Sequence, residues 1–442
     1  MGEELLQMYI KEVAASLYAW DLADEGISNI ADTLTERCSV NSIYLVGVMH
    51  FEKRPLTSLF YTHNKVRKYY QPENSRAYYK LDLNSFKNTK LKPMFSERDF
   101  LKDTDWLDVL TKEARRRGLK AGLELSHTIF DTDIAKQNHP EMLQRDVTER
   151  IIGEAGNVWL CPNHPDVHEY MRAMFYDSVK NHDIDFIQTC LLTFPQGYPV
   201  RAPWHFDTWM NVANPRLGAL IGAANGGCFC ESCRAKAKKF GFDWDLIMRD
   251  VTALFHVANA TPYIYQESMM ENHLTLGSNA TDVLVLMEYP GLMEFLKFKV
   301  KCITELFKDI YKSVHEANPN IDFRYNNHVS QPEYTGISFK DIAPYLDSVR
   351  DCDYSEQTGA KDDFLHKRSS LLKIRRGIGF EKPILAALAV RPNATPELIR
   401  RSVKVVSEMG ADGFSLGHYD CAHMEHLDAF KQGLQEAHIE II

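Results

Sequence analysis

Residues 160–194 join a segment of helical periodicity to a segment that is apolar on both faces. Apolar side chains recur at helical spacing over residues 167–179, and Pro165 stands in the first turn, where a helix needs no N–H donor. Residues 186–192 are then almost continuously apolar. A strand of this kind is typical of a parallel sheet covered by helices. The stretch therefore predicts a helix followed by a buried strand, which is half of an α/β repeat.

The same pattern recurs along the chain, and eight segments read as buried strands. They are residues 13–20, 42–50, 120–126, 186–192, 323–327, 349–354, 383–390 and 413–416. Segments of helical periodicity lie between them, at residues 26–37, 103–117, 291–316, 371–376 and 395–409, and a last one follows at residues 425–437. Eight strands alternating with helices predict an α/β fold, a (β/α)8 TIM barrel. An open doubly wound sheet is the alternative.

The connections after the second, third and fourth strands are far longer than a compact α/β unit needs. In a barrel these connections lie at the carboxyl-terminal ends of the strands, where active sites are built. We therefore expect one barrel domain over residues 1–442, with residues 195–290 as a long insertion after the fourth strand.

Composition limits the classes of partner. A net charge of −9 argues against nucleic acid or an anionic membrane as the main partner. The N-terminus shows no basic segment followed by an apolar run, and no stretch approaches the length of a membrane span. Nine cysteines without an export signal favour reduced thiols or a metal site over a disulfide framework. These features predict a cytoplasmic protein.

Three cysteines crowd into six residues within the insertion: Cys228, Cys230 and Cys233. Thiolates at this spacing can bind one soft cation, and tetrahedral zinc needs a fourth ligand. Cys190, at the end of the fourth strand, is the first choice for that ligand, and Cys161 is the second. Four thiolates would make a closed, structural Zn2+ site. Reduced surface thiols or a loop disulfide are the alternatives.

Carboxylates at the predicted strand ends are the candidates for catalysis. We expect Glu356 to be one member of a catalytic pair, with Asp353 or Glu124 as the other. Each has a plainer explanation. Asp353 and Glu356 could cap a helix, and Glu124 could form a salt bridge inside the barrel, with Arg324 as its partner.

Polar groups suited to binding sugar hydroxyls cluster at the same strand ends, and several would converge on one site in a barrel. One such residue alone is usually an ordinary hydrogen-bonding group at a rim. The expected substrate-binding residues, with Trp20 as an apolar platform, are Trp20, Asp21, His50, His127, Asn326, Asn327, His328, Arg391, His418 and Asp420.

Several motifs resemble known proteins. The C-x-C-x-x-C motif after the fourth strand resembles the zinc loop of family 42 β-galactosidases, which are clan A (β/α)8 glycosidases. The runs LCPNHPDVHEYM, CFCESC, YPGLMEFLKFK and ADGFSLGHYD, within about residues 120–420, are more similar still to glycoside-hydrolase-like barrel proteins. The family 42 acid/base does not carry over, because its place reads Leu192-Thr193-Phe194 here. The resemblance implies a carbohydrate substrate and is compatible with a homo-oligomer.

Together these features predict a glycoside-hydrolase-like enzyme that cleaves a small glycoside or oligosaccharide with paired carboxylates. Two alternatives remain open. One is a metal-dependent sugar lyase or isomerase, in which His50, Glu52, Glu124, His127, His328 and Asp353 would include the metal ligands. The other is a barrel that binds carbohydrate without catalysis.

Overall fold

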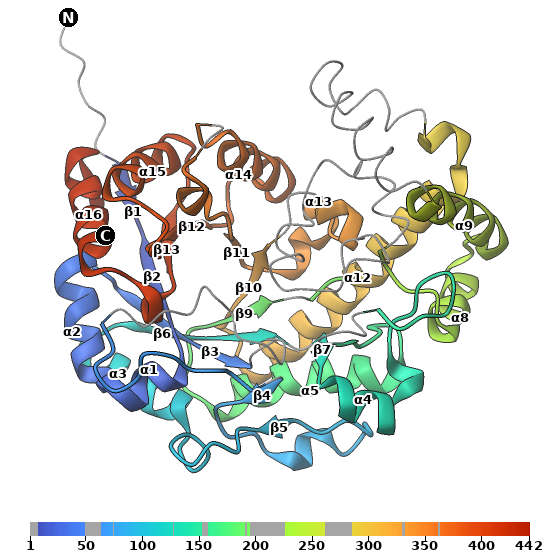
Figure 1. Cartoon of the computed structure of the whole chain (residues 1–442), viewed down its shortest axis with the longest axis horizontal. Coiled ribbons are helices and arrows are strands. Elements are labelled where there is room, and N and C mark those ends of the chain that lie inside the picture. The colour runs from blue at the N-terminus through green and yellow to red at the C-terminus, as the bar shows by residue number, and fades with distance from the viewer. Residues whose placement is uncertain are drawn as a thin grey trace, which may run out of the picture.

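The structure is a computed structural model of the chain. It describes residues 8–48, 63–73, 75–126, 128–152, 158–190, 192–194, 226–260, 285–328, 332–360 and 363–442. Its centre is a closed barrel of eight parallel strands surrounded by helices (Figure 1). The predicted (β/α)8 fold is confirmed.

The barrel strands follow one another around the barrel in chain order, and closure comes from β2, which pairs with both β13 and β3. This closure excludes the open doubly wound sheet. The strands are β2 (Glu12–Leu17), β3 (Ser42–Val48), β6 (Lys120–Ser126), β9 (Phe186–Cys190), β10 (Asp322–Asn327), β11 (Ser348–Asp351), β12 (Ile384–Ala389) and β13 (Gly413–Gly417).

The outer helices cover the strands with their apolar faces. Their starts carry the expected signals: Asp105 accepts a hydrogen bond from the N–H of Asp108, and Thr395 accepts one from Leu398. The main helices are α1 (Ala19–Glu25), α2 (Ile27–Cys38), α3 (Trp106–Arg117), α5 (Pro165–Asn181), α12 (Pro290–Ala317), α14 (Leu365–Ile378), α15 (Pro396–Glu408) and α16 (Met424–Glu436).

Further elements that the sequence patterns do not predict lie in the connections. Those after the second and third strands hold β4 (Arg76–Ala77), η1 (Leu83–Phe86), β5 (Met94–Phe95), β7 (Ile129–Phe130), α4 (Thr132–Asn138), η2 (Pro140–Met142) and β8 (Val158–Trp159). Those after later strands hold α8 (Glu231–Phe240), α9 (Trp244–Ala260), η4 (Pro332–Thr335), α13 (Phe339–Ile342), η5 (Ala343–Tyr345), η6 (Ser355–Thr358) and η7 (Tyr419–Cys421).

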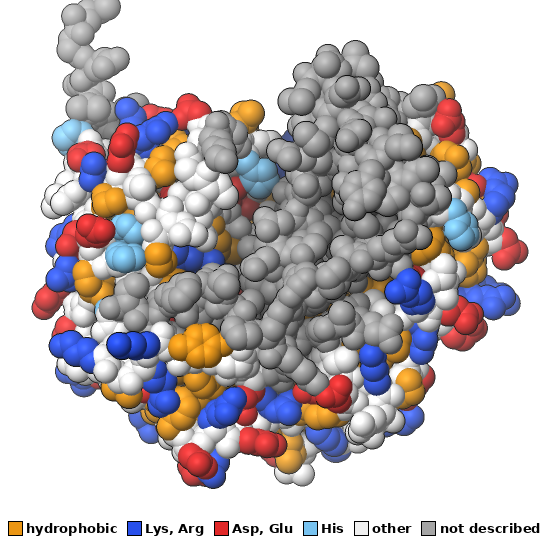
Figure 2. Space-filling model, viewed as in Figure 1, with side chains coloured by type: hydrophobic (Ala, Val, Ile, Leu, Met, Phe, Trp, Pro, Cys, Tyr) orange, Lys and Arg blue, Asp and Glu red, His pale blue; other side chains and the backbone are white. Residues whose placement is uncertain are grey.

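The two ends of the described chain pair with each other. β1 (Met8–Ile10) runs parallel to β14 (Ile439–Ile441), so the first and last colours of Figure 1 lie side by side. Figure 2 shows acidic and basic side chains interspersed over the described surface of this face. None of the described helices combines the length and the apolar character needed to cross a bilayer.

The amino-terminal end of the barrel is closed by a buried ion pair. Arg324 on β10 donates to Glu12 on β2 at 3.0 and 3.1 Å, and to Asp322 at 2.7 Å. Its guanidinium also lies 4.1 Å from the ring centroid of Phe186. The suggested pairing of Arg324 with Glu124 is therefore wrong, because Arg324 is occupied at the opposite end of the barrel from the candidate site.

Candidate functional site

Polar side chains gather at the carboxyl-terminal ends of five barrel strands. We call this group the mouth cluster; several of its side chains keep partial exposure although the strands below them are buried. The mouth cluster consists of Tyr18, Glu124, Arg350, Tyr354, Arg391, His418 and Asp420.

Glu124 on β6 points into the barrel and is nearly buried, with 6% exposure. Its carboxylate accepts hydrogen bonds from Gln188 on β9 and, at 3.1 Å, from Nδ2 of Asn326 on β10. Burial raises the pKa of Glu124 against the opposing effects of Arg350 and His328. Burial also lowers the pKa of His328 to about 4, so this imidazole is neutral near pH 7. Glu124 is therefore held toward its protonated form.

Asp420, in η7 just after β13, is a second buried carboxyl group. Burial raises its pKa to about 6, although Arg391 opposes this. Neither of its oxygens has a hydrogen-bond partner of normal geometry among the described residues. Asp21 lies nearby and caps α1 by accepting the N–H of Tyr18 at 2.8 Å. Burial and the charge of Asp420 raise the pKa of Asp21, so the two carboxyl groups resist being ionised together.

Tyr18 senses both carboxyl groups. Burial, Asp420 and Glu124 all raise its pKa, which places its hydroxyl within electrostatic range of both carboxyl groups. That hydroxyl is 3.3 Å from Nδ1 of His418, and the same nitrogen is 2.8 Å from the Ser16 hydroxyl. Glu124 and Asp420 thus both act electrostatically on one tyrosine at the carboxyl-terminal end of the barrel.

Tyr354 is contacted by two arginines. Arg350 donates to its hydroxyl at 2.7 Å, and the guanidinium of Arg391 lies 4.8 Å from its ring centroid. The Tyr354 hydroxyl also lies over Gly417, where an added Cβ would come within 2.1 Å of it. Only glycine fits at this position of β13 while Tyr354 keeps its place.

Trp20 does not lie where a sugar platform would. The first strand ends at Leu17 instead of Trp20, because α1 begins at Ala19. Trp20 is fully buried and stacks on Tyr18 at 4.4 Å. Its ring is therefore not exposed for the expected role as an apolar platform for a sugar. It packs against the ring of Tyr18 instead.

Glu356 lies away from the mouth cluster. It is fully buried and accepts hydrogen bonds from Lys367 of α14 at 2.6 Å, from Ser402 of α15 and from the backbone N–H of Ala389 at 3.1 Å. These partners occupy both carboxylate oxygens and belong to the outer helices and the end of β12. Glu356 is therefore placed as a structural ion pair between barrel and helices, not as a catalytic group.

Asp353 stabilises the turn before η6, although the N-cap position itself is Tyr354 and not Asp353. One oxygen accepts the N–H of Ser355 at 2.9 Å at the start of η6, and the other contacts Nδ1 of His366 on α14. Although burial opposes it, His366 and Lys367 lower the pKa of Asp353. Asp353 is thus an ionised turn-capping group, and it does not join Glu124.

The structure separates the neighbours Asn326 and Asn327, because alternate residues of a strand face opposite sides. Asn326 points into the barrel between Glu124 and Arg350, whereas Asn327 donates to Asp351 at 2.9 Å on the outer side. His50, Glu52 and His127 lie outside the described residues.

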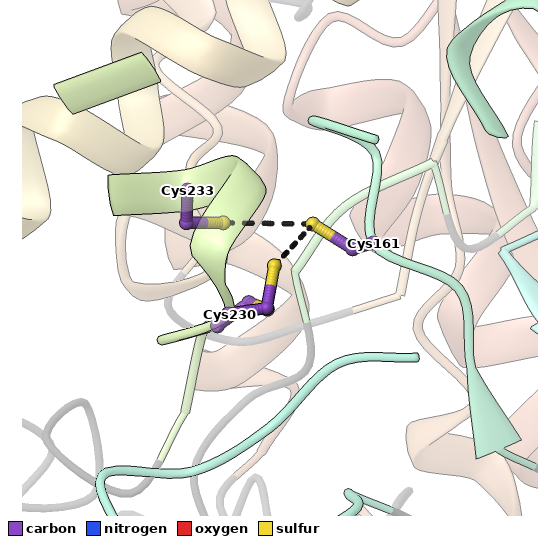
Figure 3. A group of neighbouring side chains, drawn as sticks. Cys161, Cys230 and Cys233 are labelled. Atoms are coloured by element: carbon purple, nitrogen blue, oxygen red, sulfur yellow. Dashed lines mark hydrogen bonds between the residues drawn. The ribbon is translucent and has the colours of Figure 1, made fainter. Parts of the chain in front are cut away.

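The cysteine cluster forms outside the barrel strands and includes a different fourth thiol from the first choice. Cys161, Cys228, Cys230 and Cys233 are all buried, and their sulfur atoms lie within 4.8 Å of one another. Figure 3 shows Cys161 facing Cys230 and Cys233, with sulfur separations of 3.5 Å to each. The fourth member is therefore Cys161, the second choice, and the prediction of Cys190 is corrected.

The strand geometry explains the correction. Gln188 on β9 points to Glu124 inside the barrel, and Cys190, two residues later, shares that inner face. Cys161 instead follows β8 and precedes α5, where its N–H bonds to Met142. The backbone N–H of Phe229 bonds to Arg145 of the same connection, which brings the cysteines before α8 beside Cys161.

The donor set fits a structural metal. A tetrahedral zinc with Zn–S bonds of about 2.3 Å holds its sulfurs about 3.8 Å apart, close to the separations found here. Asn163 donates to the sulfur of Cys233 at 3.2 Å, the kind of support that orients a ligand. Among the described residues, this is the only group of three or more His, Cys, Asp or Glu side chains close enough to bind one ion.

No family model matches the chain, and no curated protein matches it in sequence. Solved structures of glycoside hydrolases share the fold. The PgaB (BpsB) glycoside hydrolase domain from Bordetella bronchiseptica is 14% identical with a TM-score of 0.55, and the match covers 97% of each chain.

Two further structures show the same distant similarity. A GH42 β-galactosidase from G. stearothermophilus is 12% identical with a TM-score of 0.52, over 96% of this chain and 56% of the other. α-L-Fucosidase isoenzyme 2 from Paenibacillus thiaminolyticus is 12% identical with a TM-score of 0.52, over 97% and 49%. The chain thus spans about half the length of these two enzymes, and the similarity at this identity is one of fold.

Sequence reasoning missed Tyr18, Arg350 and Tyr354. Arg350 sits in β11, where only Val349 is apolar, so its surroundings lack the signal that identified Glu124, a charge within an otherwise apolar strand. The two tyrosines carry no such signal, because tyrosine is as common in a core as in a site.

Proposed function

We propose that the chain hydrolyses a glycosidic bond of a small carbohydrate at the mouth cluster, with Glu124 and Asp420 as the two carboxyl groups. One observation carries this proposal: two buried carboxyl groups, both with raised pKa values, lie within electrostatic range of the same residue, Tyr18, at the carboxyl-terminal end of the barrel. Active sites of this fold are built at that end, and the structural neighbours are glycoside hydrolases.

The two carboxyl groups suit different roles. Glu124, held toward its protonated form, would give its proton to the oxygen of the leaving group as the glycosidic bond breaks. Asp420, with a pKa of about 6, is mostly ionised at neutral pH. It would attack the anomeric carbon or remove a proton from the attacking water. Proton donor and electron-pair donor would then act on the two sides of one bond.

Other polar groups would hold the sugar. Asp21, Asn326, His328, Arg391 and His418 surround the two carboxyl groups and are proposed to contact hydroxyls. His50 and His127 remain proposed contacts from the sequence. Glu356, Asp353, Asn327 and Trp20 leave the proposed site, since each is occupied within the core or the outer layer.

We also propose that Cys161, Cys228, Cys230 and Cys233 hold a structural zinc ion. Four thiolates complete a tetrahedral site and leave no position for a water, so this ion would take no part in catalysis. Its role would be to fasten the start of α8 to the connection before α5. The metal–sulfur bonds would thereby stabilise these long connections.

Release of 4-nitrophenol from a panel of 4-nitrophenyl glycosides tests the activity. We expect Glu124→Gln and Asp420→Asn each to lower kcat by about 10² to 10⁴ for the best substrate. The surface variant Glu408→Gln is the matched control and should match the wild type, since its side chain is 45% exposed. Loss of activity on EDTA treatment with zinc retained would favour a metal-dependent lyase or isomerase. Sugar binding without turnover would favour a non-catalytic barrel.

A further inference from the structure

The mouth cluster contains two arginines that have no carboxylate partner at ion-pair distance among the described residues. Within the described part of the chain, Arg350 donates its hydrogen bonds to neutral groups: Ser415 at 2.7 Å, Asn326 at 2.8 Å and Tyr354 at 2.7 Å. Among the described residues, no carboxylate oxygen lies at ion-pair distance from it. A buried charge left without a counter-ion is costly, so its retention requires an explanation.

Arg391 is the second of these arginines and the more accessible. It follows β12, keeps partial exposure and places its guanidinium over the Tyr354 ring. Its Nε is buried and finds no hydrogen-bond acceptor in the described part of the chain. A cation–π contact stabilises the guanidinium but leaves N–H donors unused.

The other end of the same barrel shows that the fold can pair a buried arginine. Arg324 has two carboxylates, Glu12 and Asp322, within 3.1 Å. At the mouth, by contrast, Glu124 and Asp420 lie within electrostatic range of Arg350 and Arg391 but at no ion-pair distance. Both arginines therefore keep a charge that no described carboxylate contacts directly, and the Nε–H of Arg391 has no acceptor among the described residues.

We propose that the mouth cluster binds a sugar that carries an anionic substituent, with Arg391 as the contact residue and Arg350 adding its charge through Tyr354. The planar guanidinium suits a carboxylate or phosphate oxygen pair. The chemistry recognised is therefore that of a uronic acid or a sugar phosphate. The inference deepens the proposed function by naming its substrate class, but binding of the sugar does not require turnover.

Isothermal titration calorimetry tests the inference on the whole chain. Glucuronate and galacturonate are compared with glucose and galactose, and glucose 6-phosphate forms a second arm. We expect at least one anionic sugar to bind about tenfold or more tightly than its neutral counterpart, and salt to weaken it. Tighter binding of the uronates assigns a carboxylate, and tighter binding of glucose 6-phosphate assigns a phosphate.

Substitutions test whether Arg391 causes the preference for an anionic sugar. Arg391→Gln should remove most of the preference for the anionic sugar, Arg391→Lys should restore part of it, and the surface variant Arg37→Gln should leave it unchanged. Circular dichroism of each variant confirms the fold. Equal binding of anionic and neutral sugars, no sugar binding at all, or a preference that survives Arg391→Gln would overturn the inference.

The same measurements separate the two proposals. Anionic sugars that bind through Arg391 without turnover of any 4-nitrophenyl glycoside, glucuronide included, would retain this inference and reject the hydrolase. Turnover of neutral glycosides that needs Glu124 but is unaffected by Arg391→Gln would retain the hydrolase and reject this inference.

Discussion

Asn326 holds Glu124 in place: its amide nitrogen donates to the carboxylate at 3.1 Å while its oxygen accepts from Arg350 at 2.8 Å. The amide thus connects a carboxyl group of raised pKa to a guanidinium that pairs with no carboxylate of the described residues. Because each group is buried, the orientation of one fixes the other two. This contact makes Glu124 the best-supported acid of the proposed reaction.

Replacing the amide should move the pH dependence of the reaction. Asn326→Asp removes the donated hydrogen bond and adds a nearby charge, and both changes raise the pKa of Glu124 further. An acid that must be protonated then stays active to higher pH. We expect the alkaline limb of the kcat/KM profile to rise by about one pH unit or more. An unchanged limb would show that Glu124 is not the titrating acid.

The Asp420 carboxylate should destabilise the folded protein at neutral pH. Its folded pKa of about 6 lies above the ordinary value of 3.8, so its protonated form is favoured by folding. The stabilisation is complete below the ordinary value and is lost as pH rises toward 6. The free energy of unfolding of Asp420→Asn, relative to that of the wild type, should therefore increase from pH 4 to pH 7 by on the order of 2–3 kcal/mol. Urea unfolding at both pH values measures this, and a pH-independent difference contradicts it.

The fourth thiol can be tested by two matched substitutions. Cys161→Ser should lower the zinc content measured by plasma mass spectrometry and reduce the melting temperature, because one of four ligands is lost. Cys190→Ser should keep one zinc per chain, since Cys190 faces the barrel interior. Zinc retained by the first variant and lost by the second would restore the original choice of ligand.

Glu356 should matter for stability and little for chemistry. Lys367 and Glu356 are both fully buried and lie 2.6 Å apart. Removing either partner leaves an uncompensated charge, so Lys367→Met and Glu356→Gln should each destabilise by about 3–5 kcal/mol in urea unfolding. The protein that remains folded should keep its kcat. A loss of kcat beyond about 10² in folded Glu356→Gln would return this residue to the catalytic pair.

The barrel was predictable because its strands carry the signal of burial. Residues 186–192 are almost continuously apolar, with Gln188 and Thr189 as exceptions, and a strand of this kind is typical of a parallel sheet covered by helices. By contrast, β1 and β14 have three residues each and are too short to stand out, since the pairing of two chain ends does not depend on local pattern. Closure and the order of the strands follow from the alternation with helices.

The site was predictable only in part, because the direction of a side chain depends on the turn that follows its strand. Glu356 leaves its strand end through η6, which sends it outward to Lys367. Cys161 joins the cysteine cluster because the connection before α5 and the connection before α8 meet in space. The spacing of residues along the sequence does not predict this contact. Glu124 was identifiable because a carboxylate inside an apolar strand must be paired, be protonated or face a site.

The turnover of Glu124→Gln on the best 4-nitrophenyl glycoside is the most direct test of the proposed chemistry. The substitution keeps the size of the side chain and its place between Gln188 and Asn326 while removing the proton that the leaving group needs. The hydrolase proposal predicts a fall in kcat of about 10² to 10⁴ with the melting temperature nearly unchanged. A folded variant that turns over as fast as the wild type would contradict it.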